Sequence, residues 1–137
     1  MMKHKYKSQI QTLIKVNNTH IQKQENEILK LMGKKNKLLK DLDEKDKAIT
    51  ELIKEKTHFK TNYFNSLPSK IFATEQVNFF RNHLEMFEAR VVDARSQKDK
   101  VQKEIDTVQA NILKHREALK KYSFKNEKYD YLKVSFG

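Results

Sequence analysis

Two long stretches of the chain repeat apolar residues at alternating spacings of four and three positions. The first runs from Ile10 to Tyr63 and the second from Val77 to Tyr122. A repeat of about 3.5 residues that is sustained over several heptads predicts long α-helices that supercoil around a partner helix. The apolar residues at these positions are Ile10, Ile14, Ile21, Ile28, Leu31, Leu38, Leu42, Ile49, Leu52, Phe59 and Tyr63, then Val77, Phe80, Leu84, Phe87, Val91, Ala94, Val101, Ile105, Val108, Ile112, Leu119 and Tyr122. The pattern therefore predicts an all-α, coiled-coil protein.

The break between the two stretches contains the only proline of the chain, Pro68. Asn65, Ser66 and Ser69 lie beside it, and these residue types favour turns. Proline cannot continue a helix, because it lacks the backbone N–H and its ring clashes with the preceding turn. A connection this short lets the second helix fold back on the first. We therefore expect an antiparallel helical hairpin.

The helix boundaries follow from the same signals. Thr74 followed by Glu75 is typical of a helix N-terminus, with an N-cap and an acid in the first turn. The repeat weakens after Tyr122, because Asn126 and Lys133 fall at core positions. We expect one stalk domain over residues 1–137, made of a helix at about 8–62, a loop at 63–73, a helix at about 75–122, and a tail at 123–137 that frays into coil.

The register of the hairpin can be tested by pairing the core positions of the two helices. One register pairs all of them, and it puts Phe59 opposite Val77 and Ile14 opposite Tyr122. A shift by one heptad satisfies the same repeat. The pattern therefore leaves the register open within one heptad.

The residues along the predicted hairpin are unevenly distributed. Lys35, Lys45 and Lys98 fall at core positions, so we expect the weakest packing around residues 35–45 and 91–101, with the ammonium groups reaching water. Aromatic residues gather near the loop, and Phe72 and Phe79 have no place between the two helices. Exposed aromatic residues often mark an interaction site.

The composition narrows the kinds of partner. The chain has 29 Lys and Arg against 18 Asp and Glu, a net charge of +11, which favours acidic partners: nucleic acid, anionic lipid or an acidic protein surface. It has no cysteine, so disulfides and thiolate metal sites are excluded. No apolar run is long enough to span a membrane, and no apolar segment typical of a secretory signal follows the first residues. We expect a soluble protein of a reducing compartment.

Catalytic and metal-binding patterns are absent from the sequence. No two of the five histidines have the i, i+4 spacing of a helical metal pair, and His115 is expected to be a half-buried structural residue opposite Ile21. No phosphate-binding loop or nucleophile elbow occurs. A two-helix rod offers no concave site for catalysis. We therefore expect a protein that is not an enzyme, has no cofactor and acts by binding other proteins.

The start of the second helix carries a further indication. The stretch Thr74–Val91 has a phenylalanine, Phe80, and a leucine four residues later, Leu84, followed by two positions on the same face, Phe87 and Val91. Together with the layout of two long basic helices, this stretch resembles the FliJ/YscO-like family, the stalk proteins of bacterial type III secretion and flagellar export. The resemblance covers about residues 8–122 in layout and 74–91 in motif.

The resemblance implies a place in an export apparatus. Members of this family insert into the pore of a hexameric export ATPase, touch the cytoplasmic domain of the export gate protein, and can carry secretion chaperones. It implies export-gate contacts at Phe80, Leu84, Phe87 and Val91, although Phe87 and Val91 depart from the family example. These four residues also fall at core positions, so packing between the helices is the alternative role.

By the same analogy, the two chain ends would contact the ATPase. The basic residues expected to meet its acidic pore walls are Lys3, Lys5, Lys7, Lys15, Lys120, Lys121 and Lys125. The resemblance implies a location in the bacterial cytoplasm, peripheral to the inner-membrane apparatus. From the residues we expect a protein that is monomeric alone and that neither inserts into the membrane nor binds nucleic acid, because acidic residues interrupt its basic faces. Two alternatives stay open: a generic coiled-coil scaffold, such as a parallel homodimer kinked near Pro68, and a basic rod that binds nucleic acid.

Overall fold

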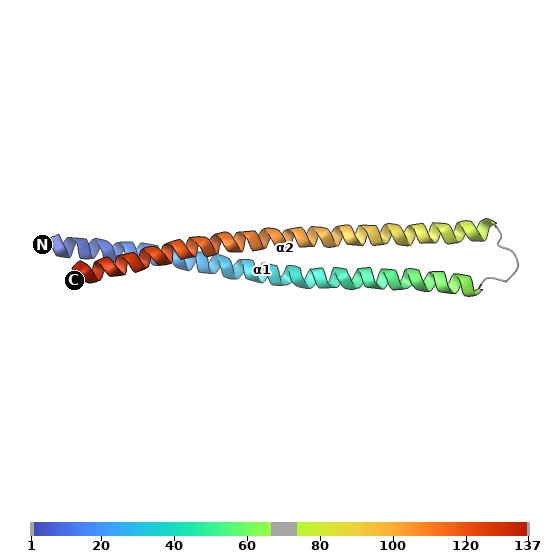
Figure 1. Ribbon diagram of the computed structural model, residues 1–137, viewed down its shortest axis with the longest axis horizontal. Helices are drawn as coiled ribbons and strands as arrows, with labels where there is room; N and C mark the ends of the chain where they lie inside the picture. The colour runs from blue at the N-terminus through green and yellow to red at the C-terminus, as the bar shows by residue number, and fades with distance from the viewer. Residues whose placement is uncertain (1, 67–73, 137) are drawn as a thin grey trace. The chain divides into compact units, whose positions relative to one another are not determined.

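The protein is an all-α helical hairpin. A computed structural model describes residues 2–66 and 74–136, with side chains described for residues 5–65 and 74–135. Helix α1 spans Met2–Ser66 and helix α2 spans Thr74–Phe136. The two helices run in opposite directions and pack against each other, which confirms the predicted fold class (Figure 1). Pro68, Phe72 and most of the expected loop lie outside the described residues.

The helices are longer than the sequence pattern predicted. Helix α2 begins at Thr74, with Glu75 in its first turn as expected. It continues to Phe136, so the expectation of a tail that frays into coil after Tyr122 is wrong. No Gly or Pro interrupts this stretch, and Asn126 finds a polar partner on α1, so nothing in it ends the helix.

Burial follows the heptad repeat along both helices. We use the term seam for the core positions of the repeat, the a and d positions of each helix. Every described seam position between Lys7 and Tyr63 of α1 is buried or half-buried, and so is every seam position between Phe80 and Lys133 of α2. The apolar spacing of the sequence therefore identifies the face by which each helix packs.

Contacts divide the chain into two compact units. The first, called the terminal unit, joins Met1–Asn36 and Asp106–Gly137. Its buried apolar side chains are Ile10, Ile28, Val108 and Ile112, and Ile112 is only 2% exposed. Asn17 is also buried, at 5% exposure. This unit therefore combines a tight apolar seam with one buried amide.

The second unit, called the loop unit, comprises Lys37–Ile105. Val91, Val101 and Ile105 of α2 are buried here, whereas the seam residues of α1 are all half-buried. The amine of Lys98 lies 2.5 Å from the carboxylate of Asp46, and the amine of Lys45 lies 3.8 Å from the carboxylate of Asp41. Both lysines thus reach carboxylates at the helix surface, as expected of lysines that snorkel out of a seam. The α2 side of the stretch nevertheless packs well.

The register differs by one heptad from the one that pairs Phe59 with Val77. That register would place Asn17 opposite Leu119, but the Asn17 side chain donates to Asn126 Oδ1 at 2.7 Å, one heptad further along α2. In the loop unit, Tyr63 stacks on Phe80 at 4.3 Å between ring centroids, again one heptad beyond the expected partner position. The physical reason lies in the asparagines. Pairing them satisfies two amides that the other register would bury against apolar residues.

Gly33 gives a test of the helix through the terminal unit. It lies at an exposed helical position without a positive φ, and an added Cβ would meet nothing within 4 Å. We expect Gly33→Ala to raise the free energy of unfolding by about 1 kcal/mol, because alanine has the higher helix propensity. Urea unfolding followed by circular dichroism measures this. Ala110→Gly, at an exposed position of α2, should lower it by a similar amount, and a Gly33→Ala variant without stabilisation would contradict a continuous helix at this residue.

Candidate protein-binding surfaces

The four residues implied as export-gate contacts lie on the face of α2 that packs on α1. Phe80 stacks on Tyr63, and Phe87 lies 5.7 Å from Phe59 between ring centroids. Leu84 is half-buried and Val91 is buried. The structure therefore uses all four side chains for packing between the helices, the alternative that the sequence left open.

An aromatic cluster surrounds Phe59 in the loop unit. Its ring lies 5.2 Å from His83, 5.7 Å from Phe80 and 6.5 Å from Phe79, measured between centroids. Phe64 packs its ring edge-on to Phe80 at 5.3 Å. Phe64 and Phe79 remain largely exposed, as expected for Phe79. The cluster thus holds two exposed rings in fixed positions beside the seam.

The basic residues expected to contact the ATPase belong to the terminal unit. Five of them are exposed, namely Lys5, Lys15, Lys120, Lys121 and Lys125, whereas Lys7 is half-buried. The amine of Lys125 lies 5.7 Å from the centroid of the Tyr122 ring. The side chain of Lys3 lies outside the described residues. Both chain ends therefore contribute cations to the same unit.

An exposed aromatic face of α2 was not predicted from the sequence. Phe124, Tyr131 and Val134 are 71%, 72% and 80% exposed. Their spacing of seven and three residues places them on one side of the helix, away from the seam. Lys121 and Lys128 lie one turn from these rings along the same helix. The sequence held a signal for this face, because no helix breaker separates Tyr122 from Phe136.

His115 has the structural role that its seam position suggested. It is half-buried, and its Nδ1 donates a hydrogen bond to Gln24 Oε1. His20 stacks on Tyr122 with 5.0 Å between ring centroids. These contacts join α1 and α2 in the terminal unit, so the two histidines serve the helix interface.

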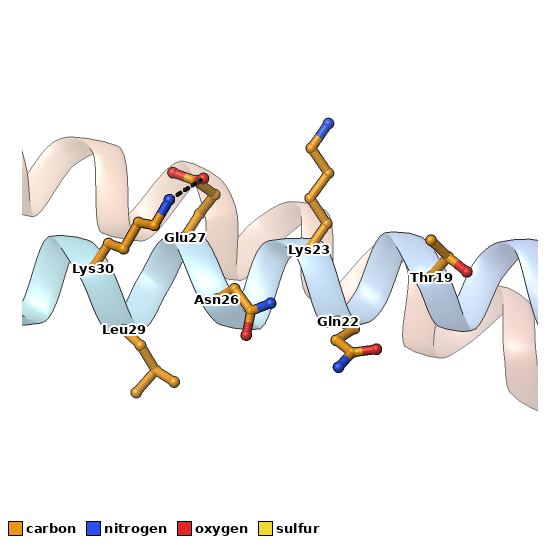
Figure 2. A pocket seen from close by; sticks show the side chains of 7 residues that line it. All are labelled: Thr19, Gln22, Lys23, Asn26, Glu27, Leu29 and Lys30. Carbon is orange, nitrogen blue, oxygen red and sulfur yellow. Dashed lines mark ion pairs between the residues drawn. The ribbon is translucent and has the colours of Figure 1, made fainter.

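Hollows on the surface of the two described helices are lined mainly by polar and charged side chains. One of about 570 Å³ lies on α1 alone, where Lys23, Glu27 and Lys30 point to one side of the helix and Gln22 and Leu29 to the other (Figure 2). The Lys30 amine and the Glu27 carboxylate lie 3.8 Å apart there. Within residues 2–66 and 74–136, no group of His, Asp and Glu side chains could hold a metal ion. No helix in these ranges is apolar over a length that could cross a membrane.

No protein-family model, curated protein or solved structure matches the chain. The resemblance to the FliJ/YscO-like family thus rests on the stretch Thr74–Val91 and on the layout of two long basic helices. The structure describes one of these two features, the layout, as two long helices that form a hairpin. Membership of the family stays a prediction.

Proposed function

We propose that the protein is a non-enzymatic central stalk of a type III protein secretion or flagellar export apparatus. In this role it binds the hexameric export ATPase, promotes its oligomerisation and activity, and links it to the export gate protein. The observation that carries the proposal is a long antiparallel hairpin whose two units expose different chemistry. The terminal unit exposes lysines with aromatic rings, and the loop unit exposes the rings held by the Phe59 cluster.

The terminal unit has the surface that an acidic partner requires. Exposed lysines such as Lys120 and Lys121 supply positive charge, which steers association with a carboxylate-rich pore wall. Phe124 and Tyr131 add large exposed rings beside them, and aromatic residues frequently carry most of the binding energy of an interface. We therefore assign the ATPase contact to this unit.

The gate contact is assigned to the loop unit. Since Phe80, Leu84, Phe87 and Val91 pack in the seam, their proposed role is to hold the helices together beneath the exposed rings. Phe79 packs on Phe59, and Phe64 packs on Phe80. A gate protein would then bind the two exposed rings rather than the seam. Secretion chaperones are further proposed partners, and the proposed location is the bacterial cytoplasm beside the inner-membrane apparatus.

The ATPase contact can be tested with the purified export ATPase. The full chain should co-sediment with the hexamer and raise both hexamer formation and the rate of ATP hydrolysis. The double variant Phe124→Ala, Tyr131→Ala should bind at least about tenfold more weakly, because truncating two interface rings costs more than about 1.4 kcal/mol. Circular dichroism should show unchanged helix content, since both rings are exposed.

Leu113→Ala is the matched control for this experiment. Leu113 is an exposed apolar residue of α2 in the same unit, and it lies outside the proposed contact. The control should behave like the wild-type chain. A wild-type chain that leaves both ATPase assembly and ATPase rate unchanged would refute the stalk function, whereas equal losses for both variants would refute only the assignment of the contact.

The same surface supports one alternative, the binding of single-stranded nucleic acid. Aromatic side chains set among lysines can stack on bases while the lysines contact phosphates, and Tyr131 and Phe124 have this setting. Titration with fluorescent single-stranded and duplex DNA at about 0.15 M salt separates the two functions. Tight binding that the Phe124→Ala, Tyr131→Ala variant loses would favour the alternative.

A further inference from the structure

The loop unit carries apolar residues that the two-helix seam does not use. Leu39 and Ile53 lie at the e position of α1, next to the seam, and Ile53 is 41% exposed. A two-stranded coiled coil needs apolar residues only at a and d, whereas an added apolar e position is typical of helices that also pack against a further neighbour. Helix α1 therefore has a wider apolar stripe than its contact with α2 requires.

A groove between α1 and α2 brings this stripe together with apolar residues of α2. It has a volume of about 510 Å³, and Ile53 lines it from α1 while Val91 and Val92 line it from α2. Val91 is buried, so it forms the floor, whereas Val92 is 67% exposed. Ile53, Val91 and Val92 thus form an apolar strip along a groove that is open to solvent and otherwise lined by polar and charged residues, namely Lys56, Thr57, Lys60, Glu88 and Arg95.

Charged residues divide the rim of this groove into a neutral centre and two positive ends. At the centre, the Lys56 amine and the Glu88 carboxylate lie 3.5 Å apart. Lys60 comes one turn beyond Lys56 on α1, and Arg95 comes two turns beyond Glu88 on α2. Because the helices are antiparallel, these two residues lie toward opposite ends of the groove. Neither forms an ion pair within the part of the chain that the structure describes.

We propose that this groove binds an amphipathic helix of another protein, one whose apolar stripe is flanked by acidic residues. An apolar helix face laid in a groove between two helices is a recurring mode of peptide recognition. The unpaired cations at the two ends favour acidic residues beside the apolar stripe of the bound helix. A carboxylate there is attracted by the positive charge, whereas a lysine is repelled by it. A second copy of this chain is disfavoured for the same reason, since each chain carries a net charge of +11.

This inference is independent of the stalk function, because it concerns a different surface of the chain. The test uses the full chain and two synthetic helical peptides that share one leucine stripe, the first flanked by glutamates and the second by lysines. Binding is measured by fluorescence anisotropy at about 0.15 M salt. At this ionic strength, charged groups that lie closer together than the Debye length still attract or repel one another. We expect the glutamate-flanked peptide to bind and the lysine-flanked peptide to bind at least about tenfold more weakly.

Variants assign the binding to the groove. Val92→Asp should lower the affinity for the glutamate-flanked peptide at least about tenfold, because it places a carboxylate in the apolar strip. Leu113→Asp is the matched control, because Leu113 is an exposed apolar residue of α2 in the terminal unit and lies outside both proposed contact surfaces, and it should leave the affinity unchanged. The double reversal Lys60→Glu, Arg95→Glu should invert the preference, so that the lysine-flanked peptide binds better. Circular dichroism should show full helix content in every variant, since these side chains are exposed.

Four results would overturn the proposal. They are equal binding of both peptides, binding of neither, equal losses for Val92→Asp and Leu113→Asp, and a dimer in light scattering that Val92→Asp converts to a monomer. The last of these would show that the groove is occupied by a second copy of the chain. The ATPase experiment instead tests a contact made by Phe124 and Tyr131, so a negative result with the peptides does not contradict the stalk function.

Discussion

Replacing Ile112 by alanine should lower the free energy of unfolding by about 3 kcal/mol, within the usual range for a buried Ile→Ala change. Ile112 is 2% exposed and is the most completely buried side chain among the residues described. Removing its outer carbons loses their transfer free energy and leaves a cavity between two helices whose seam residues above and below stay in place. A hairpin has few other buried side chains to compensate, so a large share of its stability is lost.

Urea unfolding followed by circular dichroism measures the Ile112 effect. Leu113→Ala is the control, because Leu113 is the next residue along α2 and is half exposed to solvent. Its change in free energy should stay within about 0.5 kcal/mol, as is usual for surface positions. Equal destabilisation by the two substitutions would mean that α2 does not present Ile112 to α1, and the heptad assignment of the terminal unit would be wrong.

The sequence predicts which residues pack because periodicity is a local property. The spacing of Val101, Ile105, Val108 and Ile112 turns these side chains to one face of any α-helix, whatever lies against that face. All four are buried in the structure. Phe80, Leu84 and Phe87 follow the same rule, so their seam positions already indicated the packing role that the structure describes.

The register needed information that the repeat does not hold. Shifting one helix by a heptad brings each seam residue opposite an equivalent position, so the apolar pattern satisfies both registers. The difference lies in single polar residues. Asn17 pairs with Asn126 in the observed register, whereas the heptad repeat alone makes Asn126 a weak core position. The repeat therefore predicts a helix that ends before Asn126, and it does not reveal the face formed by Phe124 and Tyr131.

The groove in the loop unit depends on the register as well. Ile53 and Val92 are far apart in the sequence and lie outside the seam, so no periodic pattern connects them. They line one groove only because the helices pair as observed, which also sets Lys56 beside Glu88. A surface formed by two helices can therefore be predicted only when their register is known. The seam of each helix, in contrast, follows from the sequence of that helix.

The pair formed by the buried Asn17 and the half-buried Asn126 should determine the register at a measurable cost in stability. The side chain of Asn17 donates to Asn126 Oδ1 at 2.7 Å and to the Tyr122 carbonyl at 2.6 Å. Asn17→Leu should lower the free energy of unfolding by about 1–3 kcal/mol, because Asn126 Oδ1 loses its donor and faces an apolar side chain, while Asn126 Nδ2 keeps its hydrogen bond to Asn18 Oδ1 at 2.6 Å. The double variant Asn17→Leu, Asn126→Leu should recover this loss, since leucines replace both partners and bury apolar surface.

The double variant should nevertheless lose its preference for one register, as buried polar residues at core positions fix the alignment of coiled coils. The chain has no cysteine, so introduced pairs report the alignment directly. Gln24 and Leu119 lie one heptad from Asn17 and Asn126, so cysteines at these two positions should cross-link in the wild-type background. Cysteines at Gln24 and Ile112 should cross-link only after a slip of one heptad.

The comparison of these two cysteine pairs separates alignment from stability. In the double-leucine background, we expect less cross-linking between cysteines at positions 24 and 119 and more between cysteines at positions 24 and 112. Urea unfolding should show that this hairpin is at least as stable as the wild type. An unchanged cross-linking pattern would mean that other contacts fix the register. The hydrogen bond from Lys35 to Gln109, at 2.7 Å between Nζ and Oε1, is the contact of the terminal unit to replace next.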